Sequence, residues 1–381
     1  MPPRISPPPC LRMPSALLTA IGSGGGGLAA VSLLRRAVLS KNLVTIQALV
    51  RSATLSGHPE AGRAAAGYRE LVRLADQNPA AANQVLSMPI VGLWALHTLT
   101  ALRSADPSAT PGELPELIER FAGPADSVPH LTAESGSLRL DLRLEPVDRR
   151  HLPATAVRYE LAGDESDLER WRNRLAAGWE FLVRDHRPRA VEAGAVLSLL
   201  VPQPESGNSH GSATLRHGFG LIMMSRPPSA SATAVTITHE VQHAKLAALM
   251  DMFRMVEPDR REMHYAPWRP DPRPTTALLQ GAYAHLGVAG FWRERMYAEP
   301  DPVAAARAQV EFARWHEATE QSTATLLDGA ALTPIGRRFA TAMRDQLARW
   351  HAEPVPAGRR AEARSHNDRH RAKWQQAHGR P

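Results

Sequence analysis

The stretch "TITHEVQHAKL", residues 236–246, places two histidines four positions apart with a glutamate directly after the first. An α-helix turns by about 100° per residue, so His239 and His243 project from one face and can share a metal ion. The surrounding segment 234–253 is apolar on almost every side, which predicts a helix buried in the core. Polar groups buried there need partners, because an unpaired one is costly. The motif therefore predicts a metal centre on a core helix.

A catalytic metal takes three protein ligands and keeps one position open, so a third ligand is required. Downstream of the motif the candidates are His264, His285 and His316. His285 shares one face of a predicted helix at 275–293 with apolar residues, so we select it as the third ligand. The alternative is a core histidine bonded to a neighbouring carbonyl. His264 falls in a proline-rich loop, and His316 falls in a charged helix where a surface position is expected.

Glu240, the candidate catalytic residue, is rotated by about 100° from His239 around the helix. In zinc peptidases a glutamate at this position acts as general base on the metal-bound water. On iron the same carboxylate could be a ligand, or could orient one through a hydrogen bond. The sequence leaves the role of Glu240 open among these.

The loop "HYAPWRPDPRP", residues 264–274, places Arg269 and Arg273 among prolines and aromatic residues. A stiff segment of this kind suits the presentation of a guanidinium to a carboxylate ligand. The alternative is a surface loop whose arginines lie along apolar surface with their charged ends in water.

The composition is that of an ordinary globular protein, with 43% hydrophobic and 22% charged residues in a chain of 381. Its single cysteine, Cys10, excludes an intramolecular disulfide and a Cys-ligated structural zinc site, which favours a cytoplasmic location. The N-terminus is too weakly apolar for a secretory signal, and no apolar run of about 18 residues predicts a membrane span. Nucleic-acid binding is not expected, since the basic residues lack interleaved aromatic ones.

Changes in the sequence pattern divide the chain into four regions. Residues 1–15 are expected to be flexible, and 16–130 to form a helical N-terminal region. Residues 131–352 hold the motifs and are expected to form the metal-binding catalytic region. In the basic tail, 353–381, most residues are polar or charged, so we expect a disordered extension.

The fold class expected is mixed α+β and mainly helical, with the motif helix and a second ligand-bearing helix beside a small sheet. Period-two alternation of leucines predicts a strand at 135–147, and apolar runs predict others at 195–203 and 213–225. The motif helix is expected to begin at Ser229 or Ser231. Further helices are predicted at 31–52, 59–76, 80–103 with a break at Pro89, 165–186, 275–293, 300–327, and 333–352 with its start at Thr333 and Pro334.

The segments "THEVQHAKLAALMD", "HYAPWRPDPRP" and "LLQGAYAHL", between Phe219 and Arg295, strongly resemble a family of actinobacterial HExxH proteins. That family is associated with ribosomally made, post-translationally modified peptides and contains 2-oxoglutarate-dependent peptide β-hydroxylases. The likeness extends more loosely to "GGGGLAAVSLLRRAVLSKNLVTIQALV" and "ALTPIGRRFATAM", and so covers most of the chain except the tail.

The resemblance implies an Fe(II) centre with His239, His243 and His285 as its protein ligands. 2-Oxoglutarate would chelate the metal, and Arg269 or Arg273 could bind its far carboxylate. A precursor peptide and molecular oxygen would be the other substrates, with hydroxylation at the β-carbon of a peptide side chain. This reaction needs no general base.

Two other classes of protein fit the residues. A zinc-dependent metallopeptidase would use Glu240 as base, but Lys245 and Leu249 stand where the longer metzincin motif requires glycine and histidine. A peptidase with a downstream glutamate ligand remains open, although the second helix offers His285 instead. A binding protein that recognises a leader peptide through the helical N-terminal region would make the histidines incidental.

Overall fold

The computed structural model describes residues 11–123, 129–144, 165–204, 211–258, 262–329 and 331–379. Within them lie thirteen α-helices, a five-stranded sheet and a two-stranded sheet. The prediction of a mixed α+β, mainly helical fold is confirmed. Most of the start expected to be flexible, residues 1–10, and the end of the strand predicted at 135–147 lie outside the described residues.

The N-terminal region is helical, as predicted. Proline breaks the predicted helix 80–103, because Pro89 occupies the first turn of a new helix. Asn78 caps the helix before it by accepting a hydrogen bond from the Ala81 N–H at 3.1 Å. The elements are α1 (Ser15–Gly22), α2 (Gly27–Leu55), α3 (Ala61–Gln77), α4 (Pro79–Ser87), α5 (Pro89–Arg103), a 3-10 turn at Pro111–Glu113 and α6 (Leu114–Ala122).

The larger sheet has the strand order β1-β2-β3-β5-β4. Strands β2, β3 and β5 pair in parallel, while β1 and β4 pair antiparallel at the two edges. The segment predicted as a strand at 213–225 is broken at its glycines, as expected, and only its last part is a regular strand. The elements are β1 (His130–Ser135), β2 (Leu138–Leu144), α7 (Glu165–Asp185), α8 (Arg187–Val196), β3 (Leu199–Gln203), β4 (Ser212–Ala213) and β5 (Leu221–Ser225).

The two central strands separate two hydrophobic cores. Side chains alternate between the faces of a strand, and in β5 Leu221 and Met223 join the core formed with α3–α6. Ile222 and Met224 join the other core, formed mainly with α7–α12. A strand buried on both faces reads as a continuous apolar run, which is the pattern "LIMM" shows.

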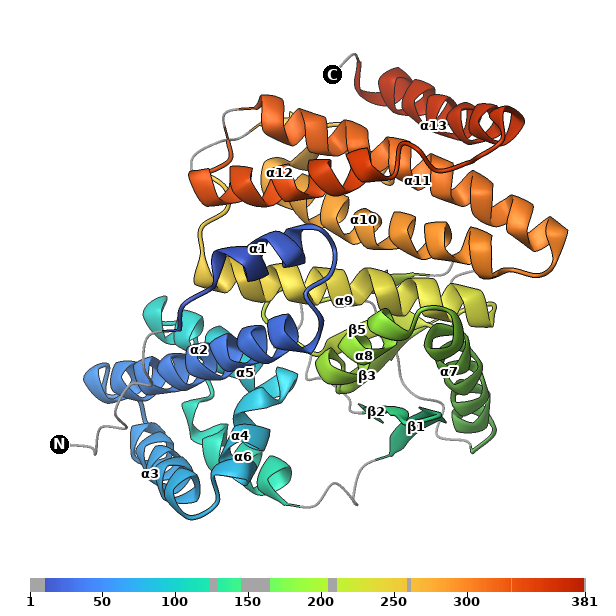
Figure 1. Cartoon of the computed structure of the whole chain (residues 1–381). Coiled ribbons are helices and arrows are strands. Elements are labelled where there is room, and N and C mark those ends of the chain that lie inside the picture. Colours follow the sequence, from blue (N-terminus) through green and yellow to red (C-terminus); the bar gives the residue numbers. More distant parts are fainter. Residues whose placement is uncertain are drawn as a thin grey trace.

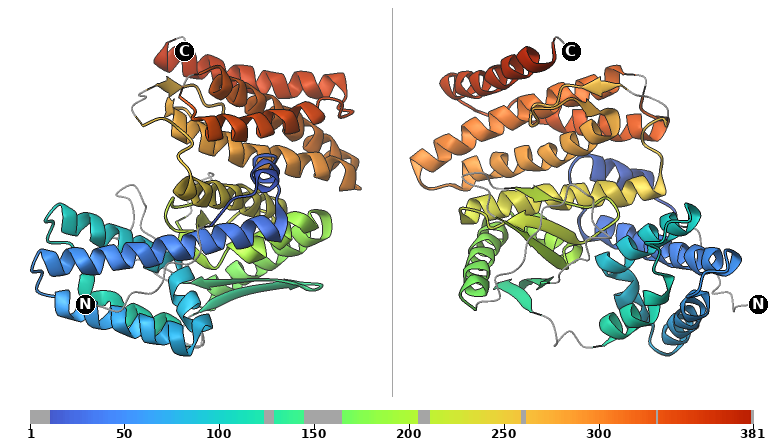
Figure 2. Two further views of the ribbon diagram at one scale, coloured as in Figure 1. Left: turned by 60° about the vertical axis from the view of Figure 1, so that its left-hand side comes forward. Right: turned by 180° about the vertical axis from the view of Figure 1, so that it is seen from behind.

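The motif helix α9 (Ala230–Met252) runs through the middle of the molecule (Figure 1). Ser229 caps it by accepting from the Ala232 N–H at 3.1 Å. The sheet and the helices α2–α6 lie on one side of α9 (Figure 2), and the C-terminal helices are stacked on its other side. The remaining elements are β6 (Met263–His264), β7 (Arg273–Pro274), α10 (Thr275–Ala298), α11 (Pro302–Asp328), α12 (Pro334–Arg349) and α13 (Ala357–His378).

The prediction of a disordered tail was wrong. Most of residues 353–381 form α13, which packs against α11 in the outermost layer (Figure 1). Ala363 and Trp374 are the buried residues of this helix. Their separation of eleven residues amounts to three helical turns, so both lie on one face of α13. This face packs against the rest of the protein, although most other residues of the helix are charged or polar.

Within the described residues, each helix taken singly is too short or too polar to cross a membrane. Two bent pairs, α1 with α2 and α4 with α5, reach the required length and hydropathy only when each pair is counted together.

Candidate metal centre

Three of the predicted histidines meet at the interface of α9 and α10. The His239 ring lies edge-on to both of the others, with centroids 4.7 Å from His243 and 5.0 Å from His285. The Nε2 atoms of His239 and His243 face each other at 3.0 Å. The four-residue spacing on one helix produces this approach, as the sequence predicts.

Hydrogen bonds of His285 and His243 show which ring nitrogen of each is left to bind a metal. His285 donates from Nδ1 to the Gly281 carbonyl at 2.8 Å, because a carbonyl can only accept. His243 Nδ1 lies 3.2 Å from Oε1 of Gln280, whose amide nitrogen in turn contacts the sulfur of Met250. Both rings therefore present an unprotonated Nε2. A donated Nδ1–H of this kind is the usual way in which a metal-ligating histidine is oriented.

The environment favours the neutral form of His239 and His285. Burial, reinforced by His243 nearby, lowers the pKa of His239 to about 4. Burial also lowers the pKa of His285 well below its usual value, with His239 contributing in the same direction. A neutral imidazole has the lone pair that a metal ligand needs.

The donor set fits a metal ion. Two nitrogens each about 2.1 Å from one ion and at right angles to each other lie about 3.0 Å apart, as in an octahedral site. The Nε2 atoms of His239 and His243 have this separation, and without a cation or a proton their lone pairs would repel. His285 lies less close to the other two histidines. Among the described residues, no set that contains all three histidines has its ligand atoms within 4.8 Å of one another.

Two tryptophans enclose the His285 ring. Trp268, from the loop before α10, stacks on one side with centroids 4.4 Å apart and planes at 17°. Trp315, from α11, packs at 4.6 Å. The indole of Trp268 can approach α10 only because residue 281 is glycine, where a Cβ atom would lie 2.5 Å from the indole. The ring position of His285 is therefore set by packing as well as by its hydrogen bond.

The carboxylate of Glu240 is engaged by two hydroxyl groups that line the histidine cavity. Its carboxylate accepts hydrogen bonds from the hydroxyls of Ser212 at 2.7 Å and Thr214 at 2.5 Å. The side chain is buried and is not among the residues that line the adjoining cavity. In this arrangement Glu240 fastens the short edge strand β4 and the residue after it to α9.

A cavity of about 810 Å³ opens beside the histidines. Arg269 and Arg273 lie in its wall, and both form ion pairs with Asp271, at 2.9 and 3.0 Å. Burial of Asp271 opposes ionisation, but the hydrogen bonds from Arg273 and Arg269 prevail, so the pKa of Asp271 is lowered. Arg216 lies in the same wall and forms no ion pair with any residue that the structure describes. The wall thus carries an excess of positive charge.

The structure separates the other two histidine candidates from this cavity. His264, half-buried, contacts the Thr275 hydroxyl through Nε2 at 2.9 Å. The expectation that His316 lies at the surface was wrong. It lies between α11 and α12, where it donates from Nε2 to the Leu347 carbonyl at 2.9 Å. His316 is buried because it packs against α12, a contact that the charged residues around it in the sequence do not reveal.

The opposite side of the motif helix holds the glycine-rich turn between α1 and α2. Gln242 donates to the Gly24 carbonyl at 2.9 Å. Lys245 donates to the Gly25 carbonyl at 2.8 Å and pairs with Glu192 of α8 at 2.7 Å. Glu192 also accepts from the Gly27 N–H at 2.7 Å, at the start of α2. These buried contacts fix the position of α9 and hence of its two histidines.

Sequence reasoning did not find three residues of the cavity wall. Arg216 precedes a glycine-broken strand, and Trp315 stands among charged residues of α11, so neither has a local signal that points to a site. Trp268 lies in the quoted proline-rich loop, where only the arginines were singled out. Comparison with protein-family models and with curated proteins gave no match to this chain.

Proposed function

We propose that this protein is an Fe(II)- and 2-oxoglutarate-dependent hydroxylase that modifies the β-carbon of a side chain in a ribosomally made peptide. The observation that carries the proposal is the pair of facing His239 and His243 Nε2 atoms beside a cavity with an arginine-rich wall. The proposal also rests on the resemblance of the motifs to peptide β-hydroxylases.

Iron and 2-oxoglutarate, when bound, would supply the oxidising chemistry, with oxidative decarboxylation to succinate coupled to hydroxylation. His239 and His243 would hold the metal through Nε2, with His285 as third ligand. The guanidinium groups of Arg216, Arg269 and Arg273 are suited to bind the far carboxylate of 2-oxoglutarate.

The two tryptophans would keep water away from one side of the centre. Trp268 stacks on the His285 ring, and Trp315 packs against it at a tilt. When the groups around a metal are held in place and water is excluded, reaction is restricted to the substrate that fills the open side of the cavity.

The position of Glu240 favours the hydroxylase over the zinc peptidase. A general base must reach the water that it deprotonates, either directly or through one bridging water. Both carboxylate oxygens of Glu240 instead accept hydroxyl hydrogen bonds from Ser212 and Thr214, which line the cavity themselves. The hydroxylase reaction requires no base at this position.

The space available favours a peptide substrate. The cavity of about 810 Å³ lies within the range typical of ligand sites, and a second cavity of about 450 Å³ adjoins it. The two share Arg216, Met250, Pro274 and Thr276 as wall residues. Together they offer a groove longer than 2-oxoglutarate needs. The proposal assigns the protein to the cytoplasm, in keeping with its single cysteine.

The test is turnover by the Fe(II)-loaded protein, prepared without oxygen and then mixed with 2-oxoglutarate, oxygen and candidate precursor peptides. Succinate formed together with a peptide heavier by one oxygen atom would support the proposal. Bound zinc with a cleaved peptide and no succinate would replace it with the metallopeptidase mechanism. Peptide binding that survives His243→Ala, with no metal in either protein, would indicate the leader-binding class.

A further inference from the structure

A second group of metal-ligating side chains lies at the junction of α11 and α12, outside the histidine cavity. We propose that His316, Glu320 and His351 form a zinc site that fastens α11 to the end of α12. This site does not depend on the proposed hydroxylase function.

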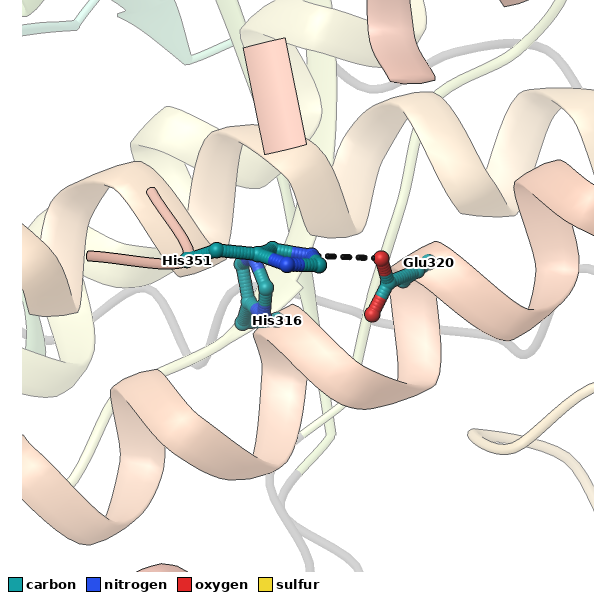
Figure 3. A group of neighbouring side chains, drawn as sticks. All are labelled: His316, Glu320 and His351. Carbon is teal, nitrogen blue, oxygen red and sulfur yellow. Dashed lines mark hydrogen bonds and ion pairs between the residues drawn. The ribbon is translucent and has the colours of Figure 1, made fainter. Parts of the chain in front are cut away.

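The three residues are the one set of three or more His, Cys, Asp or Glu side chains among the described residues whose ligand atoms all lie within 4.8 Å of one another. His316 and Glu320 are four residues apart on α11, so they project from one face. His351 follows the end of α12 and lies over them, with its ring 5.2 Å from that of His316 (Figure 3).

The ring of His316 is held in a metal-ready orientation. Its Nε2 donates to the Leu347 carbonyl at 2.9 Å, which leaves Nδ1 as the atom with a lone pair. Such a bond from the second nitrogen is the common support of a metal-bound histidine. The imidazole is buried between the two helices, so its position does not depend on the other two residues.

Glu320 and His351 are free to adjust around an ion. Their side chains are 45% and 55% exposed, and they contact each other through Oε1 and Nε2 at 2.6 Å. An exposed pair of this kind contributes little to stability by itself. Exposure gives an ion access from solvent and allows both side chains to contract onto it. The proposed site thus combines one fixed ligand, His316, with two ligands that can move toward an ion, Glu320 and His351.

The donor set favours zinc among the available divalent ions. Two imidazoles and a carboxylate suit a tetrahedral Zn²⁺ with solvent as its fourth ligand, whereas Mg²⁺ and Ca²⁺ prefer oxygen ligands alone. An ion held here would join α11 directly to His351, two residues beyond the end of α12. Because Trp315 adjoins His316 on α11 and packs on His285, the same clamp would steady one wall of the histidine cavity.

The test is calorimetric titration of the metal-free, untagged protein with Zn²⁺. Two zinc ions are expected to bind to the unaltered chain, one at each histidine group. The variants His351→Ala and Glu320→Gln change exposed side chains, so they should fold normally. Each should weaken binding of one of the two ions by at least about tenfold. His366→Ala, at a half-buried residue of α13, is the matched control and should bind both ions as before.

Thermal unfolding provides a second readout, because an ion that binds only the folded state raises its stability. In the double variant His239→Ala/His243→Ala, zinc should still raise the unfolding temperature, and adding His351→Ala should abolish that rise. If the double variant binds no zinc, or if His351→Ala and Glu320→Gln leave both affinities unchanged, the second site does not exist.

Discussion

The residues of α9 contact different parts of the protein, according to the side of the helix on which they lie. His239 and His243 face α10 and the cavity, while Glu240 is directed to β4. Gln242 and Lys245 hold the glycine-rich turn on the other side. A helix with polar groups on every side can be buried only when each group has its own partner. Each of these five residues has at least one such partner, and the Gln242 Oε1 atom is the group left without one among the described residues.

The role of Glu240 can be tested by the isosteric change Glu240→Gln. A glutamine can still accept a hydrogen bond from Ser212 or Thr214, so we expect a stability loss of about 1 kcal/mol. If the protein is the proposed hydroxylase, iron binding should be retained and turnover should stay within about tenfold of that of the unaltered protein, since a general base contributes about 10²–10⁴-fold where one is used. Metal analysis and steady-state rates measure both. A loss of activity of about a thousandfold with normal iron content would instead favour the base mechanism.

Among the buried charges of α9, Lys245 is the one whose removal should lower the free energy of unfolding most. Lys245→Met leaves Glu192 buried with only the Gly27 N–H as partner, and breaking such a pair typically costs about 3–5 kcal/mol. Urea unfolding should show this loss. The double variant Lys245→Met/Glu192→Leu should be less destabilised than Lys245→Met alone, because no unpaired carboxylate remains. Equal destabilisation of the two variants would show that the ion pair itself is not the cause.

At the scale of elements, the contact of the Trp268 loop with α10 depends on Gly281. A methyl group there would meet the indole of Trp268 at 2.5 Å, so Gly281→Ala should displace the indole from the His285 ring. We expect altered tryptophan fluorescence and weaker iron binding. Gly62→Ala in α3 is the control, because no atom lies within 4 Å of its added Cβ. It should stabilise the protein slightly, by up to about 1 kcal/mol. Unchanged iron affinity in Gly281→Ala would contradict this account.

The last helix, α13, supports the loop that carries Arg269 and Arg273. Trp374 packs edge-on against Tyr265 at 5.3 Å, and His370 bonds the Tyr265 hydroxyl at 2.9 Å. Trp374→Ala should therefore destabilise the protein by about 3 kcal/mol or detach α13 locally. Amide hydrogen exchange should become faster in residues 262–274. If exchange there is unchanged, α13 packs against the molecule without supporting the loop.

The sequence predicted most helices well because their signals are local. Ser229 and Thr333 cap their helices where expected, and the spacing of His239 and His243 follows from helix geometry. The helix of the tail was missed because its two buried residues are diluted by charged ones. The tryptophan enclosure of His285 was not predictable, since Trp268 and Trp315 come from separate elements and only packing brings them together.

At the scale of the whole molecule, a charged cluster joins the α7–α8 junction to α10. Glu294 accepts from His186 at 2.8 Å and from Arg189 at 3.0 Å. Burial alone would raise the pKa of Glu294, but Arg189 and the hydrogen bond from His186 outweigh it and lower the pKa to about 2. A carboxylate whose pKa falls on folding stabilises the folded state above its unfolded pKa of about 4.5.

This cluster predicts a pH dependence of stability. The contribution of Glu294 should be complete above about pH 4.5 and should be lost as the pH falls toward 2. Glu294→Gln should lower the unfolding temperature at neutral pH and flatten its decline between pH 4.5 and 2. Calorimetric scans across that range measure both effects. An equally steep decline in the variant would show that other carboxylates control acid unfolding.

Long-range organisation was the part of the fold least accessible from sequence. The alternation in β5 does not reveal that two separate cores lie on its two sides, because both faces are apolar. The role of Arg216 is likewise hidden in the sequence, because its place in the cavity wall depends on how β5, α9 and the Trp268 loop are assembled. Local patterns identified the candidate ligands, while the surroundings of these residues arise from tertiary packing.

The central claim is that the histidine cavity transfers oxygen from O₂ to a peptide. The most direct measurement is turnover under heavy-isotope dioxygen, in unlabelled water, with Fe(II), 2-oxoglutarate and the precursor peptide, followed by mass spectrometry of both products. We predict one heavy oxygen atom in the peptide and one in succinate, and neither product with His243→Ala. A peptide cleaved with oxygen taken from water, and no labelled succinate, would contradict the account.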